Sequence, residues 1–406
     1  MTRHVPGLTV VTNSELQTFR DCPQKWHFAY VENLRPKVAP RALSFGSAIH
    51  GGLAAGLALH AARLAQQAGT SAEECAEAGV AECKRLQNAW FAKVVEHGTH
   101  GDEELEQLAT EAEQTVDTST WMVRHYFQTF ASDLQHLVPL GIERSFELVL
   151  LDRTGRRLSH LRMAGVHDLV AYDRSAQDLV IFDHKTTSGE VQSIDRRVEL
   201  DPQMAGYLWA LREAIRRKAF DAKLLAALDP VTYRRVLDGQ VPTGRIVYNV
   251  LRKRRPRLPE VTQKGLVSAA AIDTLPEFYE AALGEQEARG HARTEKQAEL
   301  LARLEAKGDS YLSRREFFRS DEEIARWRRE VFLDASRIRH ARRDPGLVTR
   351  NAGHCTMPWS MPCVYRQVCL DPSAPELRES FRVATQAHEE VAEAAREDEV
   401  TDVVPF

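Results

Sequence analysis

Apolar and polar positions divide the chain into helical segments toward both ends and a strand-rich segment between them. Apolar residues recur at helical spacing over residues 12–32, 46–67, 72–97 and 103–137. Stretches rich in β-branched and aromatic residues predict strands over 142–151, 158–172, 178–185 and 244–252. Helical spacing also covers residues 201–218, 269–307 and 321–343. This order predicts an α/β fold, in which a mixed central sheet is flanked by helices and carries large helical insertions.

The same pattern predicts how the chain is organised. Pro23 interrupts the first helical segment, so we expect a kink or break near Cys22. The segments we expect are N-terminal helices (1–70), a helical insertion (71–140), the core (141–260), a helical region (261–344), a cysteine-rich, loop-like closing segment (345–383) and an acidic flexible tail (384–406).

Composition narrows the function classes. The 406 residues carry a net charge of −4, so a nucleic-acid partner would require positive charge that is concentrated locally. The sequence has no apolar run long enough to cross a bilayer and no apolar signal core, so we expect a cytoplasmic protein without a membrane partner. Six cysteines in so long a chain argue against a disulfide scaffold, and clustered cysteines in a reducing compartment more often bind metal.

Candidate chemistry begins at the end of the third predicted strand, in the sequence DLVIFDHKTTSGE. Because strand side chains alternate between faces, Asp183 and Lys185 point the same way and His184 points oppositely. The carboxylate of Asp183 can hold a divalent metal, and the Lys185 ammonium can contact a phosphate or an attacking water. The alternative interpretation is an ordinary salt bridge on an edge strand.

Three further motifs change the balance between these interpretations. GVHDLVAYD places Asp168 in the preceding strand, where a carboxylate among apolar residues needs a partner unless it faces solvent. FGSAIHGGL places His50 four residues after Gly46, although a lone helical histidine is more often structural than a ligand. DPQMAGYLWAL places Gln203 and Tyr207 on one helix face, where they suit a phosphate or form a plain amphipathic pair.

Together the motifs resemble the PD-(D/E)XK nuclease superfamily, in its RecB-like branch. The matching pairs, in chain order, are Gly46–His50, Gly165–Asp168, Asp183–Lys185 and Gln203–Tyr207. His167 is a departure, because an apolar residue is commoner at its position in the family. The resemblance implies a restriction-endonuclease-like core and metal-dependent cleavage of DNA.

The resemblance also implies the metal ligands. These are His50, Asp168, Asp183 and the backbone carbonyl of His184. Oxygen ligands suit Mg²⁺, and an imidazole ligand also suits Mn²⁺. One metal ion and two metal ions are both compatible with the motifs.

The remaining implied roles concern water and DNA. Lys185 would position or activate the attacking water, and Gln203 and Tyr207 would contact DNA or brace the site. With Asp168 and Asp183, these three complete the expected catalytic set. Glu143 and Glu147 are both candidate accessory acids, and the sequence does not choose between them.

Four cysteines form a second motif. Cys22 lies near the start of the chain, and Cys355, Cys363 and Cys369 lie near its end. This arrangement resembles AddB-type nucleases and CRISPR-adaptation exonucleases, whose four cysteines hold a [4Fe–4S] cluster. The gap between Cys355 and Cys363 is longer than is familiar in those families, so Zn²⁺ remains the alternative.

A metal at the four cysteines would tie the two ends of the chain together. Closing a loop of this length has an entropic cost of roughly 5 kcal/mol plus a constant. The other two cysteines, Cys75 and Cys83, lie in an Ala-rich helix and are expected to be core residues.

Three segments bear on DNA and protein partners. Residues 251–259 carry five basic residues and form either a phosphate-binding edge or a solvated loop. Residues 314–343 predict an arginine-rich helix, in which Phe317, Phe318 and Trp327 either line a single-strand channel or face the core. The ending DVVPF resembles the tip of bacterial single-stranded-DNA-binding proteins, which docks onto repair and recombination partners; otherwise it is a solvated acidic tail.

The expected function is that of a DNA exonuclease in recombination, repair or phage DNA metabolism, acting on single strands or duplex ends. The sequence contains no Walker-type phosphate loop, so a helicase partner would be a separate chain. The alternative is a non-catalytic DNA-binding or assembly subunit with the same fold and a zinc site.

Overall fold

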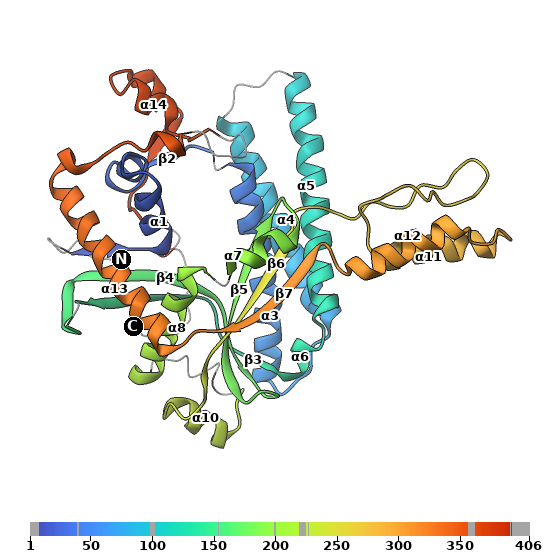
Figure 1. Cartoon of the computed structure of the whole chain (residues 1–406), viewed down its shortest axis with the longest axis horizontal. Helices are drawn as coiled ribbons and strands as arrows, with labels where there is room; N and C mark the ends of the chain where they lie inside the picture. Colours follow the sequence, from blue (N-terminus) through green and yellow to red (C-terminus); the bar gives the residue numbers. More distant parts are fainter. Residues whose placement is uncertain are drawn as a thin grey trace.

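The computed structural model describes residues 8–391, except residues 39, 98–101, 153, 199, 219–224, 226, 356–361 and 390. A six-stranded mixed sheet forms its centre, with the strand order β1-β4-β5-β6-β7 and with β3 paired to β4 (Figure 1). A separate two-stranded sheet joins β2 to β8. The strand bounds are β1 Thr9–Val11, β2 Leu34–Pro36, β3 Leu137–Leu151, β4 Arg157–Asp173, β5 Asp178–Thr187, β6 Thr243–Arg252, β7 Leu312–Phe318 and β8 Phe381–Val383.

Helices occupy most of the remaining described chain. The first group is α1 Asn13–Asp21, α2 Pro23–Trp26, α3 Arg41–Ala65, α4 Ala72–His97, α5 Asp102–Thr129 and α6 Asp133–His136. The second group is α7 Val191–Val198, α8 Pro202–Arg217, α10 Pro230–Leu237, α11 Pro276–Ala288, α12 Glu295–Lys307, α13 Asp321–Arg343 and α14 Arg366–Leu370. None of the described helices combines the length and the apolar character that a membrane crossing needs.

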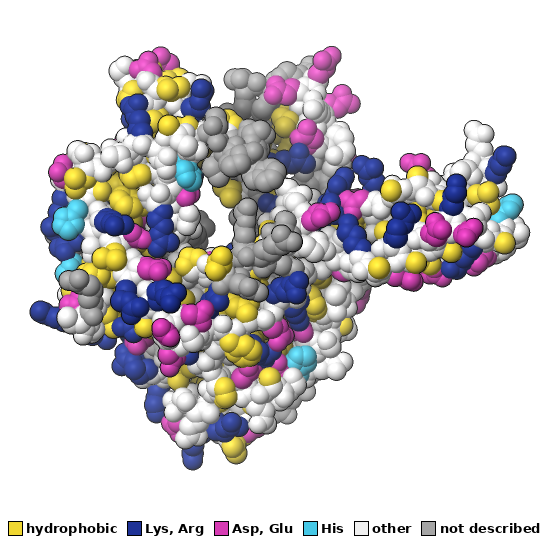
Figure 2. Space-filling view, in the orientation of Figure 1, with side chains coloured by type: hydrophobic (Ala, Val, Ile, Leu, Met, Phe, Trp, Pro, Cys, Tyr) yellow, Lys and Arg dark blue, Asp and Glu magenta, His cyan; other side chains and the backbone are white. Residues whose placement is uncertain are grey.

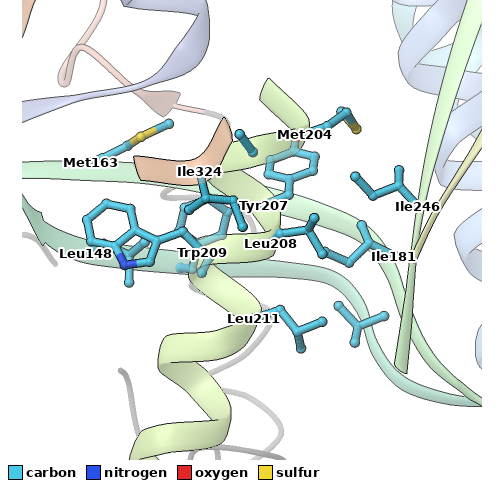
Figure 3. Packing of buried hydrophobic residues seen from close by; sticks show 14 of the residues in the cluster. Leu148, Met163, Ile181, Met204, Tyr207, Leu208, Trp209, Leu211, Ile246 and Ile324 are labelled. Carbon is cyan, nitrogen blue, oxygen red and sulfur yellow. The ribbon is translucent and has the colours of Figure 1, made fainter. Parts of the chain in front are cut away.

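Alternating side chains along β5 pack against helices on both faces of the sheet. Val180 and Phe182 join one apolar core with residues of α3, α4 and α5. Leu179 and Ile181 join the other core, where residues of α8 and α13 cover the sheet. Figure 3 shows this second core, with Leu208 of α8 close to Ile181. The expected α/β fold, a mixed sheet between helices with helical insertions, is therefore confirmed.

The topology of β4 opens a gap along one of its edges. Strand β3 pairs with β4 along most of its length, so β1 and β5 both lie along the opposite edge. Strand β1 pairs with residues 161–163 and β5 pairs with residues 169–173. Residues 164–168 lie between these two partners, and they include Gly165 and Asp168 of the sequence motif.

The segment between β6 and β7 forms an arm that projects from the body (Figure 1). Helices α11 and α12 pack on each other through their own small apolar cluster, which includes Tyr279, Leu283 and Leu300. Figure 2 shows basic and acidic side chains interspersed over the arm. The single helix expected over residues 269–307 is wrong, because a turn at Gly290 (φ 86°) and a capping box at Thr294 start a second helix.

Several other helix and strand boundaries in the structure differ from those expected from the sequence. The helix expected over 103–137 ends at Thr129, and β3 begins at Leu137 rather than at residue 142. The arginine-rich stretch begins as strand β7, so residues 314–318 are not helical. The pattern did not predict β1, the β2–β8 pair or α10. The expected break near Cys22 is confirmed, since α1 ends at Asp21 and α2 starts at Pro23.

The segment after residue 383 was expected to be a flexible tail, but its described part is packed. Ala384 is buried and donates a backbone hydrogen bond to Asn33. His388 Nε2 lies 3.0 Å from Glu15 Oε2, and Glu15 is fully buried. The final residues, including DVVPF, lie outside the described part of the chain.

Candidate active site

Three side chains meet at the open edge of β4. His50 comes from α3, Glu143 from β3 and Asp168 from β4. His50 Nδ1 lies 3.4 Å from Asp168 Oδ2 and 3.9 Å from Glu143 Oε1. Ligand atoms of all three residues lie within 4.8 Å of one another, which suits a single metal ion. The set offers one imidazole nitrogen and two carboxylates, a donor set that suits Mg²⁺ or Mn²⁺.

Gly46 allows α3 to reach this edge. A Cβ at position 46 would lie 3.3 Å from Thr186 Oγ1 at the end of β5, closer than ordinary contact. The absent side chain therefore lets the first turns of α3 lie against the end of the strand. One turn later, the same helix delivers His50 to Asp168.

Backbone geometry distinguishes Glu143 from Glu147. Glu143 has φ 45°, a left-handed conformation that is uncommon for a residue within a strand. It lies between the paired positions Ile142↔Leu169 and Arg144↔His167, beside Asp168. Glu147 instead forms an ion pair with Arg162. Such backbone outliers cluster at functional sites, which supports Glu143 as the accessory acid.

Where β4 and β5 separate, the side chain of Asp168 accepts the hydrogen bond that a strand backbone would otherwise accept. The last paired positions between β4 and β5 are Leu169 and Phe182. One step further, the backbone N–H of His184 donates to Asp168 Oδ2 at 2.7 Å. One carboxylate therefore ties the end of β5 to the group of His50, Glu143 and Asp168.

Asp183 and Lys185 form a close pair beside this cluster. Lys185 Nζ lies 2.9 Å from Asp183 Oδ1 and 2.8 Å from Oδ2. Asp183 is fully buried, and the side chain of Lys185 is about one-third exposed. The two side chains share one face of β5, as the alternation predicts, while Asp183 lies outside the tight group of His50, Glu143 and Asp168.

The charges of these groups are strongly interdependent. Burial lowers the pKa of His50, but Asp168 and Glu143 more than offset this and raise it to about 9. Burial would raise the pKa of Asp168, yet His50 and Lys185 hold it below its usual range. Burial raises the pKa of Asp183, and the nearby Asp168 adds to the effect against the opposing charge of Lys185. A cluster with opposing pKa shifts is typical of a functional site.

Gln203 and Tyr207 lie on α8 next to this cluster. Asp201 caps the helix by accepting from the Gln203 backbone N–H at 2.9 Å. Gln203 Nε2 donates to the Tyr207 hydroxyl. Burial raises the pKa of Tyr207, and the charge of Asp183 raises it further, so the phenol lies within electrostatic reach of that carboxylate. Figure 3 shows Tyr207 on the side of α8 that packs above the sheet.

A buried polar chain behind the site was not anticipated from the sequence. Asn249 of β6 is fully buried, and its Nδ2 donates to His184 Nδ1 at 3.2 Å. Arg314 Nε donates to Asn249 Oδ1 at 2.8 Å. Arg314 also forms a two-point ion pair with Asp133, at 2.9 and 2.7 Å. An asparagine in the apolar strand IVYNVL is the one sequence signal that could have revealed this chain.

Replacing Asn249 with leucine is expected to lower the free energy of unfolding by about 1–3 kcal/mol, because His184 Nδ1 and Arg314 Nε lose a buried partner. Urea unfolding measures this as a lower midpoint with an unchanged slope. The exposed Asn88 on α4 provides the control, since Asn88→Leu should change stability by less than about 0.5 kcal/mol. An unchanged midpoint in Asn249→Leu would contradict the structural role of the chain.

The four cysteines gather where the two ends of the chain meet. Burial raises the pKa of Cys369, and Cys355, Cys22 and Cys363 each raise it further, so all four thiols are close enough to interact. The Asn351 backbone N–H donates to Cys22 Sγ at 3.4 Å. Cys363 and Cys369 pack against a small apolar cluster that joins residues of the N-terminal segment to residues of the closing segment.

The remaining cysteines follow the sequence-based expectation. Cys75 and Cys83 are fully buried within the apolar core formed by α3, α4 and α5. Burial raises the pKa of both thiols to about 11. They are core residues.

The basic stretch 251–259 mainly attaches the arm to the body. Arg252 and Arg254 pair with Asp273, and Arg255 pairs with Asp117 of α5. Lys253 differs, because its Nζ lies 5.7 Å from the centre of the Phe45 ring and its backbone N–H donates to Thr187 at the end of β5. Lys253 is therefore the residue of this stretch that the fold places near the end of β5, beside the candidate active site.

Trp327 faces the core rather than a channel. It is 3% exposed and packs edge-to-face on Trp209, with ring centres 5.8 Å apart. A Cβ at Gly206 would lie 2.6 Å from the Trp327 ring, so the close packing depends on that glycine. The core-facing alternative is the one the structure supports for this residue.

These features define a class of protein. A mixed sheet with helices on both faces, with carboxylates and a lysine on adjoining strands and an imidazole from a covering helix, is the architecture of a metal-dependent nuclease. The chain belongs to the PD-(D/E)XK nuclease superfamily, whose family model matches residues 10–370. A search among curated proteins found no significant match. The superfamily assignment made from the motifs is thereby confirmed, and the RecB-like branch stays a prediction.

Proposed function

We propose that this protein is a DNA exonuclease of recombination, repair or phage DNA metabolism. The observation that carries the proposal is the meeting of His50, Glu143 and Asp168 beside the Asp183–Lys185 pair. Family membership supports phosphodiester hydrolysis with Mg²⁺ or Mn²⁺ and DNA as the substrate. Action at ends, on single strands or frayed duplexes, is the finer part of the proposal.

The donor set fits a divalent metal. His50, Glu143, Asp168 and Asp183 would hold it, together with the backbone carbonyl of His184. Such a metal, when bound, lowers the pKa of a coordinated water and neutralises charge on the scissile phosphate. The protein supplies a half-buried cluster rich in carboxylate oxygens, which is the environment that concentrates a divalent cation.

Lys185 and the α8 pair act on water and substrate. The Lys185 ammonium, anchored on Asp183, would orient the attacking water toward the phosphorus and would stabilise the charge that develops on the phosphate. Gln203 holds the Tyr207 hydroxyl, and this pair would fix the DNA backbone against the site.

An assay on linear and circular DNA tests the proposal. With Mg²⁺ or Mn²⁺, the protein should degrade end-labelled linear single strands and duplexes progressively from an end, and covalently closed circles should survive. Cleavage of closed circles would show that the protein is an endonuclease and not an exonuclease. DNA binding without cleavage of any substrate would favour the alternative, a non-catalytic DNA-binding or assembly subunit.

Metal binding should become tighter as the pH rises. His50 ligates as the neutral imidazole, and its metal-free pKa of about 9 means that a metal must displace its proton at neutral pH. Affinity should therefore increase by up to about tenfold per pH unit between pH 7 and 8. Calorimetry in buffers of different ionisation enthalpy measures the protons released.

Two histidine variants make this test specific. His50→Asn should release about one proton fewer per metal at neutral pH, whereas His97→Asn, at an exposed position on α4, should match the wild type. Equal proton release from wild type and His50→Asn would remove His50 from the ligand set.

We further propose a [4Fe–4S] cluster at Cys22, Cys355, Cys363 and Cys369. Four converging thiols and a backbone N–H that donates to one of the sulfurs fit such a cluster. Zn²⁺, which also accepts four thiolates, is the alternative occupant, and the iron, sulfide and zinc content of the purified protein distinguishes the two.

Protein partners complete the proposed function. The acidic ending DVVPF would dock onto a recombination or replication assembly, and a helicase would be supplied by a separate chain. Loss of partner capture on deletion of the last five residues, with cleavage unchanged, is the expected result.

A further inference from the structure

A cavity of about 420 Å³ is lined by residues of α1, of the N-terminus of α8 and of α13. Its size falls within the range of about 300–1,000 Å³ that is usual for small-molecule pockets. We call it the α1–α8 pocket. It is separate from the group of His50, Glu143 and Asp168, none of which lines it.

The α1–α8 pocket is nevertheless connected to the candidate active site through Gln203. This side chain lines the pocket and donates from Nε2 to the Tyr207 hydroxyl. Tyr207 in turn lies within electrostatic reach of Asp183 and Lys185. An occupant of the pocket would therefore lie one side-chain contact away from the residues that act on the phosphate.

The lining combines an apolar floor with a polar rim. Leu16, Trp327 and Val331 form the floor, and each is at most 3% exposed. Asn13 and Gln17 contribute amide groups at the rim. An apolar floor below amide donors and acceptors suits the flat face and the hydrogen-bonding edge of an unstacked nucleobase.

The charge of the lining argues against a phosphate as the occupant. The Asp201 carboxylate already caps α8, so the positive end of that helix is neutralised. Among the described lining residues the basic one is Arg20, and it is paired with Asp334 at 2.7 Å. A neutral base fits this balance better than an anion does.

We propose that the α1–α8 pocket receives one unstacked nucleobase of the strand being cut, next to the scissile phosphate. This inference rests on the proposed function and specifies its substrate as single-stranded or frayed DNA. A base held in a Watson–Crick pair cannot enter such a pocket, so an end must open before it is cut. The pocket would also set the distance between the last bound base and the cleaved bond.

An abasic scan tests the pocket. Single-stranded oligonucleotides, each with one abasic nucleotide at a successive position, are measured for binding by anisotropy in the Lys185→Ala background and for cleavage in wild type. Affinity should fall at one position by about tenfold, in keeping with loss of one base contact. Gln17→Trp, which fills the rim, should weaken binding of the intact strand by a similar factor and should be insensitive to that abasic position.

Gln107→Trp is the matched control. Both glutamines are exposed on helices, and each donates to a carboxylate four residues later. The control should behave as the wild type at every abasic position. If no position is special, or if Gln17→Trp shows the full abasic effect, the pocket inference fails while nuclease activity stands. If wild type cuts no DNA, the proposed function fails, and the binding measurements still report on the pocket.

Discussion

Lys185→Ala is expected to reduce DNA cleavage by about 10²–10⁴-fold while leaving metal binding largely intact. The ammonium touches both oxygens of Asp183 but is not part of the tight group of His50, Glu143 and Asp168. Its loss therefore removes the group that orients water and stabilises phosphate charge, without removing a ligand. Cleavage of an end-labelled oligonucleotide and Mn²⁺ binding are measured on the same preparation.

The control for this experiment is Lys84→Ala, at an exposed position on α4, which should cleave as the wild type does. Lys84→Ala should also retain the wild-type free energy of unfolding within about 0.5 kcal/mol, since exposed side chains contribute little to stability. Undiminished cleavage by Lys185→Ala would remove the lysine from the mechanism.

Cys22→Ala is expected to be the most destabilising of the variants. It removes the proposed ligand that would join the first helices to the closing segment, so loop closure worth roughly 5 kcal/mol would be lost with the proposed cluster. Iron and acid-labile sulfide should fall in the purified protein, and the unfolding midpoint should fall with them. Visible absorption that disappears on reduction or acidification gives an independent signal.

Cys75→Ala is the matched control, because it also replaces a buried thiol with a methyl group. Its metal content should equal that of the wild type. Zinc in place of iron would overturn the cluster assignment but keep the link between the chain ends. If the wild-type protein contains neither iron nor zinc and Cys22→Ala has an unchanged unfolding midpoint, both the cluster assignment and the link between the chain ends are contradicted.

Part of the candidate site was predictable because it depends on local rules. Strand alternation alone places Asp183 and Lys185 on one face of β5, and they are found in contact. The adjacent strands β4 and β5 pair antiparallel, as expected for consecutive strands joined by a short turn, and this brings Asp168 to the same strand end.

Other parts depend on geometry that the pattern does not encode. Glu143 and Glu147 have the same strand parity, and a single backbone distortion at Glu143 distinguishes them. Asn249 and Arg314 are far apart in sequence, and only the pairing of β6 with β7 brings them together. Non-local contacts of this kind have no signature within a short sequence window.

The incorrect boundaries have similar causes. Residues 314–318 have the charge pattern of the helix that follows them. They form a strand because they pair with β6 at the edge of the sheet, and this pairing outweighs their local helical preference. The segment around His388 is polar, and its packing depends on residues that lie far away in sequence, among them Glu15 of α1 and Tyr30.

Anomalous diffraction from crystals soaked in Mn²⁺ tests the central claim most directly. The claim is that His50, Glu143, Asp168 and Asp183 hold a catalytic divalent metal beside Lys185. The expected result is an anomalous peak within coordination distance of His50 and Asp168 that disappears in Asp168→Asn. Manganese bound only elsewhere, or a peak that persists in the variant, would contradict the account.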